Sequence, residues 1–250
     1  MPNYAIASQK GGVAKTTTSI SLAAGLAHQG KRILLIDMDS QANSSKVLLR
    51  GYAEIPAEQT IYRTILQKQE LAIHPTDLEK LDIVPAHILL SSTDAAIAGE
   101  FGRETRLVKQ LGKVDRQYDY VFIDCPPALG FLSINAIVAA QRVIIPTAPG
   151  FFELDSLGQI HETIQLVREE FNPELEIEGI LFCNSRPTVE SRDSLKLLRE
   201  VYGDLVFQTI IPGNVAIKEA HFNGQDVFSY DNGCRAAEEY RRLIKEVFHV

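Results

Sequence analysis

Residues 8–18 read Ser-Gln-Lys-Gly-Gly-Val-Ala-Lys-Thr-Thr-Thr, between an apolar run at 4–8 and a helical pattern over 15–29. The apolar run predicts a buried strand. A strand, a glycine-rich loop and a Lys-Thr pair at a helix start form a phosphate cradle, because loop N–H groups and the helix N-terminus converge on the anion. Lys15 is expected to reach the β- and γ-phosphates of a nucleotide, and the Thr16 hydroxyl to ligate Mg²⁺. The residues predicted to bind the nucleotide here are Gly11, Gly12, Val13, Ala14, Lys15, Thr16 and Thr17.

Apolar runs alternate with helical patterns along the chain, without an internal repeat or a polar linker. The runs are mostly short and continuously apolar, which is typical of strands buried on both faces of a sheet. The sequence therefore predicts a single α/β domain over residues 1–250, with a doubly wound, mainly parallel sheet of about seven strands and helices on both faces. The predicted strands are 4–8, 32–37, 81–85, 120–124, 142–147, 177–183 and 207–211. The predicted helices are 15–29, 103–112, 131–140, 154–171, 191–202 and 233–248, with a short helix at 60–67 in the irregular region 44–80.

Acidic residues stand at the ends of two predicted strands, where ligands of such sheets bind. Asp37 and Asp39 project on the same side of an extended chain, so they are expected to hold Mg²⁺ through water or to orient an attacking water. The alternative is an acidic strand end that caps the next helix. Asp124 follows four apolar residues, as in a Walker B strand, and is expected to meet Mg²⁺ through a water. Residues 125–130, Cys-Pro-Pro-Ala-Leu-Gly, predict a stiff loop that reports loss of the γ-phosphate.

The phosphate loop departs from the standard G-x-x-x-x-G-K-[ST] pattern at Gln9 and Ala14. It resembles instead the deviant Walker A motif of the ParA/Soj/MinD ATPases, a family of P-loop NTPases. Lys10 occupies the place of the family's second, signature lysine, which crosses to the nucleotide of the partner subunit. The resemblance thus implies an ATP-dependent homodimer. Ala14 stands where the family has Gly, and it is expected to impair hydrolysis if its backbone φ is positive.

The resemblance also implies roles for the acidic residues and for two later loops. Asp39 would position the hydrolytic water and Asp37 would support the metal shell, although Ser40 replaces the family's proline. Adenine would lie between Asn184 and the loop Pro212–Asn214, which match the family's base site; a turn residue is the alternative at Asn184. The implied cofactors are ATP and Mg²⁺. The implied catalytic residues are Lys10, Lys15, Asp39 and Asp124, and the implied metal residues are Thr16, Asp37 and Asp124.

Basic residues of the C-terminal third are candidates for DNA contacts, because ParA relatives bind non-specific DNA there as dimers. Arg186 matches the family's arginine in its loop, while Gly213 stands where an arginine is common. Each phosphate contact is weak alone, so binding would require dimerisation. The alternative is a set of solvated helix faces that pair with nearby glutamates. The candidates are Arg186, Lys196, Arg199, Lys218, Arg235, Arg241 and Arg242.

Composition excludes several other classes of protein. The 250 residues have a net charge of −7, and no apolar run reaches the roughly 20 residues of a membrane span. Residues 151–182 alone carry eight acidic side chains and one basic side chain, so the remainder is balanced and can present a basic face. We expect a cytoplasmic protein, because no signal peptide is recognised and the three cysteines suit neither a disulfide framework nor a zinc site.

These expectations combine into one functional hypothesis. The resemblance implies a Mg²⁺-dependent ATPase, slow without a partner, that binds the nucleoid in its ATP state. It would position a cargo with a ParB-like or other adaptor that stimulates hydrolysis; the cargo is a plasmid, a chromosome or a protein organelle such as a carboxysome. The alternative is a MinD-like membrane-associated spatial regulator. For residues 237–248 a closing helix packed on the sheet is favoured over a membrane anchor.

Overall fold

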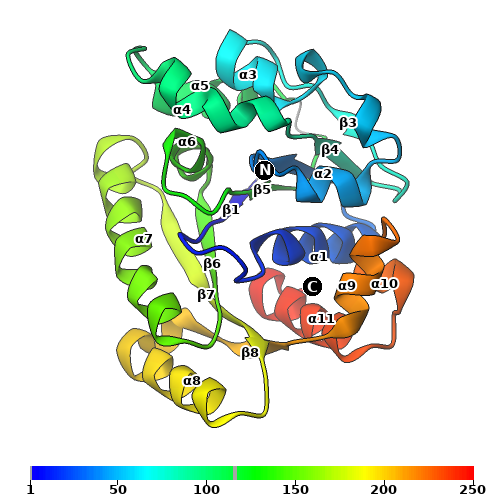
Figure 1. Cartoon of the computed structure of the whole chain (residues 1–250), viewed down its shortest axis with the longest axis vertical. Helices are drawn as coiled ribbons and strands as arrows, with labels where there is room; N and C mark the ends of the chain where they lie inside the picture. Colours follow the sequence, from blue (N-terminus) through cyan, green and yellow to red (C-terminus); the bar gives the residue numbers. More distant parts are fainter. Residues whose placement is uncertain (1, 115–116) are drawn as a thin grey trace.

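The computed structural model describes residues 2–114 and 117–250, and its eight strands form one sheet (Figure 1). The order is β3-β4-β2-β5-β1-β6-β7-β8, and every pair is parallel except β3 with β4. The mainly parallel α/β class predicted from the sequence is therefore confirmed. The strands are β1 (Asn3–Ile6), β2 (Ile33–Asp37), β3 (His74–Pro75), β4 (Leu81–Val84), β5 (Tyr120–Asp124), β6 (Arg142–Thr147), β7 (Glu176–Ser185) and β8 (Val206–Pro212).

The seven predicted strands are all present, with ends that differ by at most two residues from the prediction. The eighth strand, β3, has two residues and pairs antiparallel with β4 at the edge of the sheet. A two-residue strand shows no periodicity, and its proline suits only an edge position. For these reasons the sequence pattern did not reveal it.

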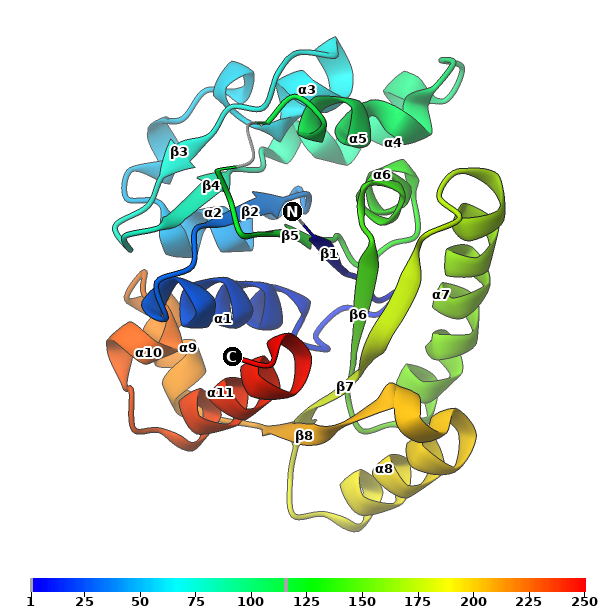
Figure 2. The same ribbon diagram turned by 180° about the vertical axis from the view of Figure 1, so that it is seen from behind.

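Helices cover both faces of the sheet (Figures 1 and 2). One face packs on α1, α2, α10 and α11, and the other on α3, α5, α6 and α7. Short 3₁₀ turns, labelled η, connect several of them. The helices are α1 (Lys15–His28), α2 (Asn43–Leu48), α3 (Ile61–Gln67), α4 (Thr93–Ile97), α5 (Arg106–Leu111), α6 (Phe131–Ala139), α7 (Phe151–Glu170), α8 (Val189–Tyr202), α9 (Val215–Phe222), α10 (Val227–Tyr230) and α11 (Arg235–Phe248). The 3₁₀ turns are η1 (Tyr52–Glu54), η2 (Ala57–Gln59), η3 (Ile88–Ser92), η4 (Arg103–Thr105) and η5 (Gly203–Leu205).

Predicted helix 103–112 is corrected by the structure, because it divides into η4 and α5. The break has a tertiary cause. The Oδ1 atom of Asn135, on α6, accepts hydrogen bonds from the backbone N–H groups of Arg106 (3.0 Å) and Leu107 (3.2 Å). A side chain from a distant helix therefore satisfies the first donors of α5, as an N-cap would. The other long helices lie where they were predicted, although α7 begins three residues earlier than expected, at Phe151.

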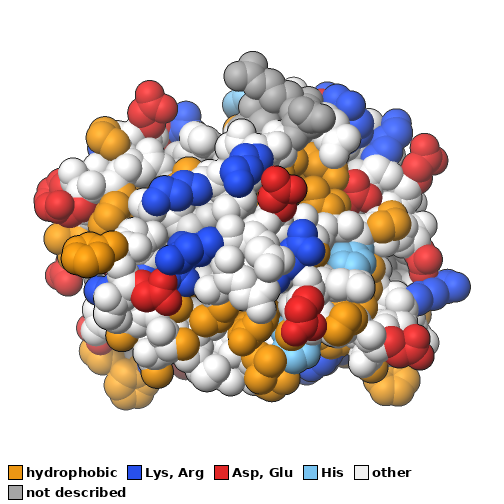
Figure 3. Space-filling view, turned by 90° about the horizontal axis from the view of Figure 1, so that it is seen from above, with side chains coloured by type: hydrophobic (Ala, Val, Ile, Leu, Met, Phe, Trp, Pro, Cys, Tyr) orange, Lys and Arg blue, Asp and Glu red, His pale blue; other side chains and the backbone are white. Residues whose placement is uncertain are grey.

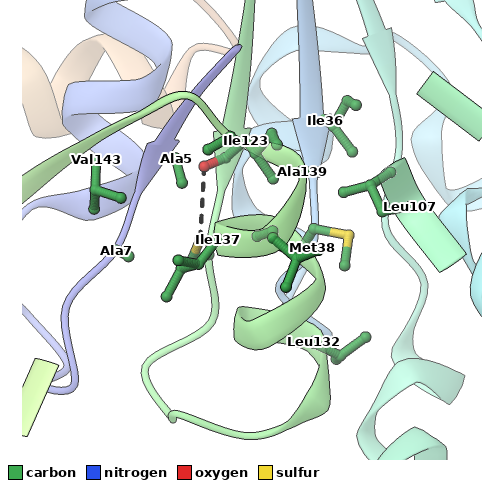
Figure 4. Close-up of a cluster of buried hydrophobic side chains, with 14 of the residues drawn as sticks. Ala5, Ala7, Ile36, Met38, Leu107, Ile123, Leu132, Ile137, Ala139 and Val143 are labelled. Atoms are coloured by element: carbon green, nitrogen blue, oxygen red, sulfur yellow. Dashed lines mark hydrogen bonds between the residues drawn. The ribbon is translucent and has the colours of Figure 1, made fainter. Parts of the chain in front are cut away.

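The two cores lie on opposite faces of the central strands. On one face, Figure 4 shows α6 packed over β1 and β5, with Ile137 near Ala5 and Ile123. Small side chains such as Ala5 on β1 leave room for the helix to approach the sheet closely. On the other face the ring of Phe248 packs within 5.1 Å of the Tyr4 ring centroid. These buried faces fix the central strands, whose carboxyl ends carry the predicted site.

Helix α11 buries its apolar stripe against the sheet, as the closing-helix prediction requires. Tyr240, Leu243 and Ile244 are fully buried, and Val247 is nearly so. The stripe is therefore occupied within the chain and is not available to lie on a membrane. Among the described residues, no helix is both long and apolar enough to pass through a bilayer.

The connection from β1 to α1 takes a backbone conformation that favours glycine. Gly12 has a φ of 77° and Ala14 a φ of 73°, both in the left-handed region. Ala14 directly precedes α1, and its carbonyl accepts the hydrogen bond of Thr18 N at 2.9 Å. An alanine in this region costs about 1–2 kcal/mol relative to right-handed backbone. Ala14 therefore has the positive φ at which it was expected to impair hydrolysis.

We expect Gly25→Ala, in the middle of α1, to lower the free energy of unfolding by about 1 kcal/mol or more. A Cβ at Gly25 would lie 2.4 Å from Ile244 Cδ1 and 3.0 Å from the ring of Phe228. Overpacking of this kind costs about 1–3 kcal/mol and outweighs the gain in helix propensity. Gly158→Ala on α7 is the control, because a Cβ there meets no atom within 4 Å. It should raise stability by about 0.5–1 kcal/mol in the same urea titration; equal effects of the two changes would contradict this packing.

We expect Ala14→Gly to leave the free energy of unfolding unchanged or to raise it by up to about 1 kcal/mol. Relief of the left-handed strain offsets the greater entropy that glycine gives the unfolded chain. Ala95→Gly, at an exposed position of α4, is the control, and it should lose about 1 kcal/mol. Denaturant titration measures both variants. A loss at Ala14 as large as that at Ala95 would show that the strain is absent.

Candidate functional site

Three adjacent strands bring the predicted site residues to one edge of the sheet. Asp37 on β2 is the register partner of Asp124 on β5, and Asp124 is also the partner of Ile6 on β1. The phosphate loop follows β1, so the loop and both carboxylates meet at the carboxyl ends of neighbouring strands. A cavity of about 1040 Å³ opens at this edge. Its lining includes Gly12, Lys15, Thr16, Asp39, Pro127 and Asn184.

Lys15 lies buried within the phosphate loop. Its Nζ atom donates a hydrogen bond to the carbonyl oxygen of Lys10 at 2.7 Å. Burial lowers the pKa of Lys15 below its ordinary value, while the negative charges of Asp124 and Asp39 act to raise it. A lysine in this position points its ammonium at the place where the loop N–H groups converge. It is thus suited to neutralise a phosphate group.

Asp124 is fully buried and is held by hydroxyl groups from two helices. Ser19 Oγ of α1 donates to Oδ1 at 3.1 Å, and Ser44 Oγ of α2 donates to Oδ2 at 2.7 Å. Burial raises the pKa of Asp124, and the hydroxyls of Ser44, Thr16 and Ser19 oppose that shift. The carboxylate is therefore fixed in orientation, which a metal-positioning residue requires.

Asp37 is also fully buried, and its oxygens hold the start of α2. Oδ2 accepts from Ser45 N at 2.9 Å and from Ser45 Oγ at 2.7 Å, and Oδ1 accepts from Asp39 N at 3.1 Å. Burial and the neighbouring Asp124 raise the pKa of Asp37. The helix-capping alternative is thus observed for Asp37, whereas Asp39 faces the cavity and accepts a hydrogen bond from Gln41 N at 2.9 Å.

The oxygen donors at this edge fit a Mg²⁺ ion. Thr16 supplies a hydroxyl at the cavity wall. Asp37 and Asp124 are fully buried and are not among the lining residues, but a cation nearby would relieve the repulsion between their adjacent carboxylates. Within the described residues, no group of three or more His, Cys, Asp or Glu side chains forms a metal cage. Mg²⁺ does not need one, since it is commonly held by one or two carboxylates together with substrate phosphates and waters.

Lys10 extends away from Lys15 and meets an aromatic ring. Its Nζ atom lies 5.6 Å from the centroid of the Phe152 ring, at the start of α7. That distance is within the range of a cation–π interaction. The sequence pattern did not single out Phe152. The available signal was the adjacent pair Phe151-Phe152, which follows the strand predicted at 142–147 by a short loop, at the edge where ligands bind.

The two predicted adenine loops are joined to each other and to the phosphate loop. Asn184 has a φ of 54°, and its Nδ2 atom donates to the carbonyl of Gly12 at 3.0 Å. Gly213 N donates to Ser185 O at 3.0 Å, which links the loop after β8 to the end of β7. Asn214 caps α9, because its Oδ1 atom accepts from Ala216 N at 2.8 Å. Asn184, Gly213 and Asn214 line one side of the cavity, whereas Pro212, the last residue of β8, is not among the lining residues.

The basic candidates divide into two groups. Three have partners inside the chain: Arg241 donates to Asn232 O at 2.7 Å and lies over the Phe228 ring, Arg242 pairs with Glu239, and Lys196 pairs with Glu200. The other four are exposed and form no ion pair within residues 2–114 and 117–250; they are Arg186, Arg199, Lys218 and Arg235.

The four exposed basic candidates differ in their distance from the nucleotide cavity. Arg186 and Lys218 line its rim, whereas Arg199 and Arg235 lie on α8 and α11. A different face, over α3, α4 and α5, mixes Lys and Arg with Asp and Glu side chains (Figure 3).

Comparison with known proteins agrees with this geometry. The AAA domain family matches residues 1–177. The sporulation initiation inhibitor protein Soj of Bacillus subtilis is 39% identical over 250 residues, which cover 97% of this chain and 96% of Soj. The chromosome partitioning protein ParA of Myxococcus xanthus is also 39% identical, over 97% of this chain and 86% of its own length.

Two solved structures resemble the whole fold. Cobyrinic acid a,c-diamide synthase from Mycobacterium smegmatis, with bound ADP and magnesium, has a TM-score of 0.85 at 32% identity, covering 100% of this chain and 94% of its own. Apo McdA from Cyanothece has a TM-score of 0.89 at 25% identity, covering 99% of both chains. The alignments with these relatives cover nearly all of the chain, and the phosphate loop with Lys10 and Lys15 lies inside the aligned region. The chain therefore belongs to the ParA/Soj family of P-loop ATPases.

Proposed function

We propose that the protein is a positioning ATPase in which Mg²⁺·ATP drives formation of a sandwich homodimer. The observation that carries this proposal is the separation of the two lysines. Lys15 is buried within its own loop, whereas the ammonium of Lys10 lies outside it, over Phe152. This separation supports a different role for each lysine: Lys15 would bind the nucleotide of its own chain, and Lys10 would contact the phosphates of a second copy, as the signature lysine of the family does.

The reaction would be transfer of the γ-phosphoryl group of ATP to water. Lys15 and the loop N–H groups neutralise charge that develops on the phosphate oxygens, and Asp39 orients the water at the cavity wall. Mg²⁺, when bound, neutralises charge on the β- and γ-phosphates. The carboxylate of Asp124, which accepts hydrogen bonds from Ser19 and Ser44, would stay fixed on the metal side of the site during the reaction. The left-handed Ala14 supports a slow basal rate, because the strained loop has less freedom to follow the transition state.

DNA would be bound by the dimer and not by the single chain. Two copies double the number of exposed arginines and lysines, and the free energies of phosphate contacts add. An adaptor of the ParB type or another protein would stimulate hydrolysis and release the dimer from DNA. The cargo class is a plasmid, a chromosome or a protein organelle such as a carboxysome, and the ATP form would lie on the nucleoid in the cytoplasm.

Two other functions are weaker candidates. A MinD-like regulator binds a membrane, but the apolar stripe of α11 is buried against the sheet. An amide-forming synthase, as in the structural relative from Mycobacterium smegmatis, is disfavoured because Soj and ParA match at higher identity over the same length. The MinD-like alternative is tested by the measurements below.

We expect Lys15→Ala to weaken ATP affinity by about 10- to 100-fold, because a charge-assisted hydrogen bond to phosphate is worth about 1.5–3 kcal/mol. Lys10→Ala should retain ATP affinity within about threefold and lose ATP-dependent dimerisation, since its ammonium lies outside the loop. Isothermal titration and analytical ultracentrifugation measure the two properties separately. Lys109→Ala, at an exposed position of α5, is the control. Normal dimerisation of Lys10→Ala would refute the role proposed for this lysine.

The function itself is tested by fluorescence anisotropy with a random-sequence duplex. We expect binding at least about tenfold tighter with Mg²⁺·ATP than with Mg²⁺·ADP, and a loss of affinity with salt that follows the number of phosphate contacts. Arg186→Ala should weaken binding and reduce the salt slope by about one per subunit, whereas Arg50→Ala, which removes the ion pair with Asp77, should not. Absence of binding in both nucleotide states, together with ATP-dependent binding to anionic liposomes, would instead support the MinD-like alternative.

A further inference from the structure

Two phenylalanines are exposed at the carboxyl edge of the sheet, beside the nucleotide cavity. Phe151 and Phe152 are 76% and 66% exposed, and they are the first residues of α7. Their rings contact each other edge to face, with centroids 5.6 Å apart. Aromatic side chains of this size normally bury most of their surface and dominate the energetics of interfaces. An adjacent exposed pair therefore represents apolar surface that the single chain leaves uncovered.

The ring of Phe152 holds the ammonium of Lys10. The Nζ atom lies 5.6 Å from the ring centroid, and the described part of the chain contains no ion pair to Lys10. An ammonium over the face of a partly exposed ring is attracted to it, and more strongly when water is removed from the contact. The aromatic face thus orients a side chain that would otherwise sample many rotamers in solvent.

The start of α7 is itself held in place, so Phe152 is a defined support for Lys10. Gly150 precedes the helix with a φ of 138°, and its N–H donates to Ser194 Oγ of α8 at 3.2 Å. The Glu153 carboxylate folds back over Gly150 so closely that a Cβ there would lie 2.1 Å from Oε2. The φ of Gly150 lies in the region that favours glycine. The hydrogen bond to Ser194 thus ties the connection from β6 to α7 to α8 directly before the aromatic pair.

We propose that Phe152 is the positioning residue of Lys10, and that Phe151 and Phe152 become buried against a second copy of this chain when Lys10 reaches that copy's nucleotide. The inference rests on the proposed ATP-dependent dimer. We infer a second copy as the partner because Lys10 contacts Phe152. Any interface that Lys10 enters therefore also includes this aromatic surface. Burial of the pair removes water from the cation–π contact, so the same step that closes the dimer strengthens the hold on Lys10.

A tryptophan reporter tests the burial directly, because the chain contains no tryptophan. Phe152→Trp places the single indole at the contact with Lys10. We expect Mg²⁺·ATP, and not Mg²⁺·ADP, to shift its emission to shorter wavelength and to protect it from acrylamide, with a midpoint that depends on protein concentration. Phe171→Trp is the matched control, since Phe171 is 46% exposed and ends the same helix about 30 Å away. If the emission of Phe152→Trp does not change on addition of Mg²⁺·ATP although the protein dimerises, the proposal is overturned.

Steady-state kinetics test the positioning role. We expect Phe152→Ala to lower kcat about threefold to tenfold with KM for ATP changed less than about twofold, because Lys10 acts in the transition state and not in ATP capture. Phe152→Tyr, which retains the aromatic face, should restore kcat to within about twofold of the unchanged protein. Phe152 is largely exposed, so the variants should fold, which circular dichroism checks.

The outcomes separate this inference from the proposed function. If the unchanged protein dimerises with ATP and Phe152→Ala matches its kcat and dimerisation, the positioning role is refuted and the dimer stands. If the unchanged protein stays monomeric with Mg²⁺·ATP in ultracentrifugation, the sandwich dimer is refuted, and the role of Phe152 is refuted with it. A loss of kcat in Phe152→Ala that tyrosine does not rescue would also contradict the cation–π mechanism.

Discussion

The side-by-side burial of Asp37 and Asp124 is the constraint on which the site depends. The two carboxylates are register partners at the ends of β2 and β5, and neither has any exposed surface. Buried carboxylates require hydrogen-bond donors, because removal from water disfavours their charge. The donors come from two helices: Ser19 of α1, and Ser44 and Ser45 of α2. Helix α1, which begins at the phosphate loop, is therefore tied to the Walker B strand by the same interaction that satisfies Asp124.

Helix α1 also connects the phosphate loop to the C-terminal third of the chain. Thr18 Oγ1 and Tyr240 Oη are 3.2 Å apart, and both residues are fully buried. Further along α1, Gly25 leaves space for Ile244 of α11 and Phe228 of α10. The closing helix is thus packed directly on α1, the helix that begins at the predicted phosphate loop. A displacement of the loop on nucleotide binding would be resisted by this core, since tightly packed interiors transmit strain.

The two lysines of the loop have opposite environments, and this difference gives them different chemistry. Lys15 is buried and bonded to the backbone of Lys10, so it is committed to its own loop. The side chain of Lys10 is half-buried, and its ammonium lies over the face of the Phe152 ring. The exposed aromatic surface around Lys10 is costly for a single chain, and contact with a second copy would remove that cost. In the proposed dimer, Lys10 would therefore link the nucleotide state to self-association.

The sequence by itself determined the features that depend on neighbouring residues. Apolar runs identified the seven long strands, and the glycines and lysines at 10–16 identified the phosphate loop, because strand burial and loop geometry follow from local patterns. The acidic ends at Asp37 and Asp124 were expected to meet, since parallel strands share one carboxyl edge. The family resemblance added the role of Lys10, which composition and spacing do not contain.

Only the tertiary structure decided which side chains complete the site. The hydroxyls of Ser44 and Ser45, the Asn135 cap that divides the helix predicted at 103–112, and the contact of Phe152 with Lys10 join residues far apart in the sequence. The structure likewise gave Arg241 a partner, the carbonyl of Asn232, where the sequence had left open a DNA contact or a pairing with a nearby glutamate. Such contacts depend on strand register and helix packing, where a shift of one residue moves a side chain to another face. Local sequence patterns do not specify these long-range contacts.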